Sequence, residues 1–104
     1  MAYNELLAVK IESIVMDIPG ITIQKMFSGL CFMNKVHMCL GIVDQKLMVR
    51  VGKEDYVKML KIKYVIYMDF SGRPLTGLIY VLPERIKRIT SVKKWITIGL
   101  KYTS

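Results

Sequence analysis

Apolar residues recur at helical spacing near the N-terminus of the chain. Four of them follow one another at intervals of four, three and four residues, which places them on one side of a helix: Leu7, Ile11, Ile14 and Ile18. The pattern predicts a helix over residues 3–18. Pro19 and Gly20 end it, because proline cannot continue a helix and glycine permits the turn that follows.

In the middle of the chain, residues 21–27 and 46–51 place alternate side chains on opposite faces, as strands do, and residues 30–33 and 37–43 resemble the two arms of a hairpin. Four strands are expected at residues 21–27, 30–33, 37–43 and 46–51. The turns between them are short, and short turns join neighbouring strands only when the strands are antiparallel. The turn at 34–36 has no glycine, which a tight hairpin favours, so a longer loop is expected there.

A short helix is predicted after Gly52, because two acids follow in the first turn, where the helix dipole favours them. Further strands are expected at 64–70 and 78–81, with a loop at 71–77 between them and a helical turn within 84–89. Thr90 or Ser91 caps a last helix. The apolar stripe of that helix contains Val92, Trp95, Ile96 and Gly99.

Strands in a run with helices at the ends predict an α+β fold: a two-layer domain in which helices pack on one face of an antiparallel β-sheet. The chain has 104 residues, enough for one domain over 1–104. Hydrophobic residues make up 53% and charged residues 23%, a globular composition rather than a disordered one.

Acidic residues interrupt the N-terminal segment and no long apolar run occurs, so we expect a cytoplasmic protein without a membrane partner. Cys31 and Cys39 are the two cysteines, and His37 is the one histidine. This set fits neither a disulfide scaffold nor a zinc pattern, so free thiols, no metal and no cofactor are expected. Nucleophile motifs with partners and phosphate-binding loops are also missing, which predicts that the protein is not an enzyme.

The net charge is +8, and such a balance favours acidic partners, nucleic acid among them. Residues 84–104 hold six cations against one acid. The candidate interaction residues there are Arg85, Lys87, Arg88, Lys94 and Lys101. Lys94 and Lys101 lie seven residues apart, opposite the apolar stripe of the last helix, so both are expected to face solvent.

Two further arginines each allow two interpretations. Arg50 lies on an otherwise mostly apolar strand. It is either an anion anchor or interface ion pair, or a side chain at an edge or outward-facing position of a half-buried sheet. Arg73 lies between Gly72 and Pro74, in a segment that either presents the arginine rigidly for recognition or serves as a tight connection.

Three segments resemble blocks of the TfoX (Sxy) N-terminal domain family of bacterial competence regulators. Residues 26–33, MFSGLCFM, are similar to the family's MFGGLxF block. Residues 47–52, LMVRVG, followed by Asp55 and Tyr56, are like its LYLRVG block with a following tyrosine. Residues 70–81, FSGRPLTGLIYV, are like its GRPM-containing block, and Trp95 fits a tryptophan of the last helix. The similarity runs in one order through the chain.

The resemblance implies a fold of the secretion-chaperone type and regulation through protein contact instead of catalysis. TfoX regulators assist a transcription activator that switches on DNA-uptake genes, so a protein partner is expected, with such an activator as one candidate. Direct, weakly sequence-specific nucleic-acid binding through the basic C-terminal surface is the alternative. A homodimer is also expected, because small domains with open sheet edges often pair.

Overall fold

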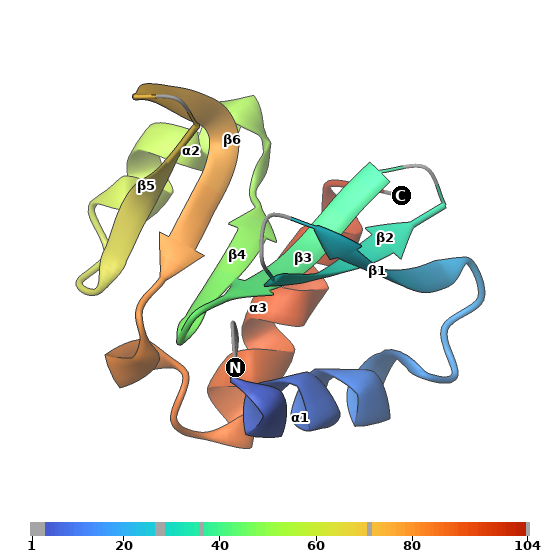
Figure 1. Cartoon of the computed structure of the whole chain (residues 1–104). Coiled ribbons are helices and arrows are strands. Elements are labelled where there is room, and N and C mark those ends of the chain that lie inside the picture. Colours follow the sequence, from blue (N-terminus) through green and yellow to red (C-terminus); the bar gives the residue numbers. More distant parts are fainter. Residues whose placement is uncertain (1–3, 27–28, 36, 71, 104) are drawn as a thin grey trace.

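The computed structural model describes residues 4–26, 29–35, 37–70 and 72–103. Its helices are α1 (Glu5–Val15), α2 (Gly52–Leu60) and α3 (Ile89–Lys101), with a 3₁₀ turn, η1 (Pro83–Arg85). Its strands are β1 (Ile21–Met26), β2 (Gly29–Asn34), β3 (His37–Val43), β4 (Lys46–Arg50), β5 (Val65–Phe70) and β6 (Arg73–Val81). Figure 1 shows their arrangement.

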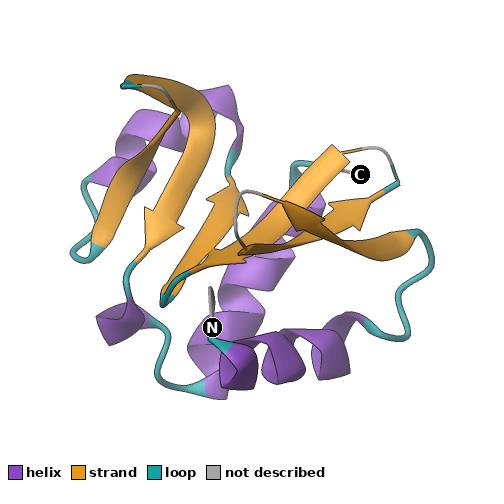
Figure 2. Cartoon of the chain, in the orientation of Figure 1, coloured by secondary structure: helices purple, strands orange, loops and turns teal. Residues whose placement is uncertain are grey.

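The six strands form one sheet in the order β1-β2-β3-β4-β6-β5. Every neighbouring pair is antiparallel. In Figure 2, α3 crosses behind β3 and β4, α2 lies behind β5 and β6, and α1 runs below, where it also contacts α3. The predicted α+β fold, with an antiparallel sheet and helices on one face, is confirmed. None of the described helices is long and apolar enough to span a membrane.

Alternate residues of the central strands form the core between the sheet and the helices. Leu40 pairs with Val49, and Ile42 pairs with Leu47, so these four side chains line one face of β3 and β4. All four are buried, in one cluster with residues of the three helices. On the sheet's other face, Met48 and its neighbours form a smaller apolar cluster. Apolar side chains therefore stabilise both sides of the central strands.

Strand β6 is longer than predicted, and the loop expected at 71–77 is wrong. The strand begins at Arg73, and Pro74 pairs with Asp69 of β5. Its pairing with β4 extends only over Leu78–Val81, so the part that holds Pro74 has one neighbour. Proline lacks an N–H donor and is tolerated where a strand is bonded on one side alone. Ser71 lies outside the described residues.

The turn between β2 and β3 also differs from the expectation. Asn34 pairs directly with His37, so the connection is a tight turn and not a longer loop. Lys35 adopts a left-handed φ of 60°, the conformation that glycine would take at less cost. The side-chain amide of Asn34 donates to Thr103 Oγ1 at 3.0 Å, which ties the hairpin to the end of α3. Tertiary contact therefore fixes a turn that local propensity disfavours. Val36 lies outside the described residues.

Helix α1 is shorter than the predicted 3–18. The Asn4 side chain accepts a hydrogen bond from the Leu7 amide, so it caps the helix N-terminus. Residues 1–3 lie outside the described part of the chain.

Helix α2 begins at Gly52, which has a φ of 77° and whose Cα faces the ring of Tyr102. The Tyr102 hydroxyl donates to the Asp55 carboxylate and joins the C-terminal segment to α2.

Candidate docking site

A pocket of about 490 Å³ lies where the end of α2, the turn η1 and the helix α3 meet. Its volume falls within the range of about 300–1,000 Å³ that is usual for ligand sites. The residues that line it are Met59, Ile62, Glu84, Arg85, Lys87, Arg88, Ser91, Lys94, Trp95 and Ile98. Apolar side chains of α2, of the turn that follows it and of α3 form the floor, and cations form much of the rim.

Helix α3 supplies both the core and one wall of the pocket. Its buried positions are Val92, Trp95, Ile96 and Gly99, which confirms the predicted stripe. Ser91, Lys94 and Ile98 recur at intervals of three and four residues and line the pocket beside that stripe. Trp95 belongs to both groups, because it is only 5% exposed yet lines the pocket.

The turn η1 forms the second wall of the pocket. It follows β6 directly, and its backbone is held by bonds from the Arg85 and Ile86 amides to the carbonyls of Leu82 and Pro83. The side chain of Ile86 is buried in the core and anchors the segment. The Arg85 guanidinium donates to the Lys63 carbonyl at 3.4 Å, so η1 is also linked to the loop before β5.

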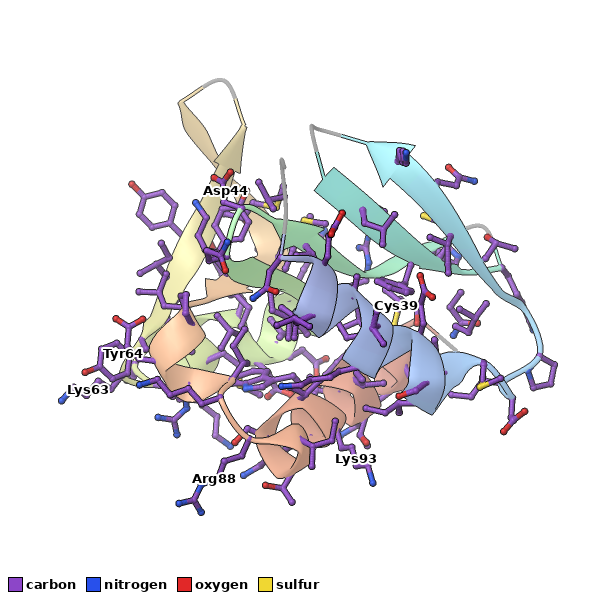
Figure 3. All side chains as sticks on the ribbon, turned by 60° about the horizontal axis from the view of Figure 1, so that its bottom comes forward. Cys39, Asp44, Lys63, Tyr64, Arg88 and Lys93 are labelled. Carbon is purple, nitrogen blue, oxygen red and sulfur yellow. The ribbon has the colours of Figure 1, made fainter. Side chains whose placement is uncertain are left out.

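Four cationic side chains line the pocket against one carboxylate, that of Glu84. Lys87, Arg88 and Lys94 are exposed, and within the described part of the chain they form no ion pair or side-chain hydrogen bond. Figure 3 shows Arg88 projecting outward from the start of α3. Their charges are therefore available to an anionic group at the pocket mouth.

The structure brings four of the seven candidate interaction residues together: Arg85, Lys87, Arg88 and Lys94. The other three lie elsewhere or are not described. Lys101 is exposed, as expected, but is absent from the lining, and its Nζ lies 5.4 Å from the centre of the Tyr102 ring. Arg73 begins β6, and its side chain lies outside the described part of the structure.

Arg50 has a role within the sheet. It is half-buried on β4, a strand with neighbours on both sides, and its Nε donates to the Met38 carbonyl at 2.7 Å. The β3–β4 pairing ends at Leu40 and Val49, so this bond adds a connection just beyond the ladder. Of the two interpretations, the structure favours a sheet side chain, since Arg50 bonds to β3 and does not line the pocket.

The cap predicted for the last helix, Thr90 or Ser91, is wrong by two or three residues. The helix begins at Ile89, with Arg88 at the N-cap position and no side-chain hydrogen bond there. Thr90 and Ser91 lie inside the first turn instead. Because the side chain of Arg88 makes no hydrogen bond to the helix N-terminus, its guanidinium can face the pocket mouth.

The sequence model of the TfoX N-terminal domain matches residues 13–102. The chain belongs to this family. That span includes α2, η1 and α3 up to Lys101, and therefore every residue that lines the pocket. Searches of curated proteins and of solved structures return no match.

The apolar floor is the part of the site that the sequence did not reveal. The sequence gives no reason to separate three apolar residues from ordinary core residues: Met59, Ile62 and Ile98. Each is half-buried and packs at the edge of the main cluster. A weak signal existed in α3, where Ile98 lies outside the stripe through Val92 and Ile96. Ile98 lies four residues after Lys94, so an apolar and a cationic side chain share one flank of α3.

The two cysteines of this TfoX N-terminal domain are buried as free thiols. Cys39 lies against α3, close to the Cα of Gly99, and His37 two residues before it is exposed. Burial raises the pKa of both thiols; at Cys39, a hydrogen bond with Thr103 and the charge of Arg50 act in the opposite direction. Among the described residues, no three His, Cys, Asp or Glu side chains gather as a metal site.

We expect native Cys31 and Cys39 to react with iodoacetamide at least roughly tenfold more slowly than in denaturant, because the thiolate is the reacting form and both sulfurs are covered. Mass spectrometry of timed samples measures this. Two adducts should form rapidly once the protein is unfolded without reductant. Equal rates in the native and unfolded protein would contradict the buried positions.

Proposed function

We propose that this TfoX N-terminal domain is a non-enzymatic regulatory domain that binds a protein partner at the pocket between α2, η1 and α3. The partner presents an acidic segment with a bulky apolar side chain. The carrying observation is the combination of two features: Lys87, Arg88 and Lys94 form no ion pair with any described residue, and they lie beside an apolar floor. The floor consists of Met59, Ile62, Trp95 and Ile98. Apolar anchors give affinity in such grooves, and complementary charges give orientation and fast association.

The alternative is direct binding of nucleic acid by the same cations. Duplex binding rests on phosphate contacts to a basic surface and needs no apolar cavity. Binding of single strands rests on bases stacked on exposed aromatic rings, but the aromatic residue that lines the pocket, Trp95, is only 5% exposed. The apolar floor therefore favours a protein partner. The family's role beside a transcription activator makes an acidic surface of such an activator the first partner to consider.

The protein carries its own reporter for this test. Trp95 is the one tryptophan of the sequence and lines the pocket, so a ligand that enters changes its fluorescence. The probe is a helical peptide without tryptophan, with one phenylalanine flanked by glutamates. We expect saturable binding at low salt that weakens as salt rises, because the rim charges are exposed. A peptide with alanine in place of phenylalanine should bind at least roughly tenfold more weakly, about 1.4 kcal/mol.

The variant Arg88→Glu with Lys94→Glu should weaken peptide binding at least roughly tenfold, since two rim charges are reversed. The matched control is Lys25→Glu with Lys53→Glu, which changes the net charge equally at exposed positions outside the pocket. Equal loss in both variants, or no saturable signal with any acidic peptide, would overturn the proposal. Tighter binding of oligonucleotides than of peptide, with a linear logarithmic salt dependence, would support the nucleic-acid alternative.

A further inference from the structure

Helix α1 has a second apolar face that points away from the core. Its buried face consists of Leu7, Ala8, Ile11 and Val15. On the opposite side, Leu6, Val9 and Met16 are 77%, 63% and 74% exposed. With Ser13 between them, these positions recur at intervals of three and four residues and form one seam. We call Leu6, Val9, Ser13 and Met16 the outer seam. Contiguous exposed apolar side chains of this kind mark an interaction surface.

Two acids border the outer seam on one flank. Glu5 and Glu12 lie seven residues apart, so they project from almost the same side of α1. Both are exposed, and within the described residues neither forms an ion pair. The outer seam therefore presents the features expected of the ligand of the pocket, which are apolar side chains beside carboxylates.

Pairing of two α1 helices with each other is disfavoured by their net charge. The exposed charged side chains beside the outer seam are Glu5 and Glu12 on one flank and Lys10 and Asp17 on the other, three acids against one cation. Two such surfaces repel each other. A basic surface avoids the repulsion, and the pocket supplies one with four cations.

We propose that the outer seam of one copy docks in the pocket of a second copy, with Glu5 and Glu12 facing Arg88 and Lys94. Helix α1 lies against one flank of α3. The pocket opens on another flank, with Ser91, Lys94 and Ile98. Figure 3 views the end of the molecule where α1 and α3 lie side by side. A closed two-fold dimer forms when the outer seam of each copy occupies the pocket of the other.

This dimer rests on the proposed function and adds regulation to it. The pocket is filled by α1 of the second copy until an acidic partner segment competes for it. Partner binding then depends on protein concentration, because dimerisation and partner capture use the same cations.

A charge-exchange experiment tests the contact. One variant carries Glu5→Lys and Glu12→Lys, and the other carries Arg88→Glu and Lys94→Glu; all four side chains are exposed, so folding should be retained. Light scattering should give a concentration-dependent dimer of the 12.0 kDa wild-type chain. Each variant alone should be monomeric, with a dissociation constant raised at least tenfold. An equimolar mixture should dimerise again, because each reversed seam meets a reversed pocket, and each unchanged seam meets an unchanged pocket.

A wild-type chain that stays monomeric at high concentration overturns the proposal, as does a mixture that fails to dimerise. Variants that dimerise as well as the wild type also overturn it. The Glu5→Lys, Glu12→Lys variant keeps an unaltered pocket and separates this inference from the proposed function. If that variant binds the acidic peptide but the mixture stays monomeric, the dimer is wrong and the pocket's function stands.

Discussion

Trp95→Ala should lower the free energy of unfolding by about 3–5 kcal/mol, the range for deleting a buried tryptophan. The indole is 5% exposed and belongs to the main core cluster, between the α3 stripe and the pocket floor. Its removal costs apolar burial and leaves a cavity that fixed helix and strand backbones cannot fill. Denaturant titration followed by circular dichroism measures the change.

Thr97→Ala is the control for the tryptophan replacement. Thr97 is exposed on the same helix, and its hydroxyl donates to the Lys93 carbonyl, so the expected change is within about 0.5 kcal/mol. A tryptophan variant as stable as this control would show that α3 is peripheral to the core. In that case the main role of Trp95 would be to contact a bound partner, and the pocket floor would belong to the protein surface and not to the core.

The parts of the fold that follow from short-range periodicity were predictable. The stripe of Val92, Trp95 and Ile96 recurs at helical spacing, and the structure buries all three. Alternation along 46–51 likewise identifies a central strand, with Leu47 and Val49 on the core side. Burial of one face imposes these patterns wherever the element lies, so they are visible before the tertiary structure is known.

Contacts between distant segments account for the mistakes. Pro74 lies in a strand because β4 does not extend beside it, and no local signal in 71–77 shows where β4 ends. Lys35 accepts a left-handed φ where Asn34 is held by Thr103, sixty-nine residues away. In each case, contacts with residues distant in the sequence outweigh the conformation that the local sequence favours.

The candidate site also has one part that could be predicted from the sequence and one part that could not. Cations within 85–94 are close in sequence, so their clustering on one surface could be predicted. Met59 and Ile62 come from another part of the chain and become a pocket floor only when α2 packs near α3. Charge alone favours acidic partners, nucleic acid among them, and the protein partner was expected from the family resemblance. The apolar floor, which requires the fold, is what favours a protein.

Gly29→Ala should be among the most damaging single changes in the chain, at about 3 kcal/mol or more. A Cβ at Gly29 would collide with the Ile42 carbonyl oxygen and lie 3.1 Å from the Ile42 carbonyl carbon. These are backbone atoms of the neighbouring strand, so they cannot rotate away as a side chain would. Relief requires β2 and β3 to separate, although Leu30 and Ile42 are paired core residues there.

Gly72→Ala is the matched control for the glycine replacement, because, apart from its chain neighbours, no atom of the described residues lies within 4 Å of a Cβ built there. Its φ of 81° leaves only a backbone cost of about 1–2 kcal/mol. Thermal and denaturant unfolding of the two variants should therefore rank Gly29→Ala as clearly less stable, or as unable to fold. A Gly29→Ala protein that matches the control would show that β2 can move away from β3 without loss. The paired core of the sheet would then be less rigid than its buried residues require, since close-packed interiors resist such displacement.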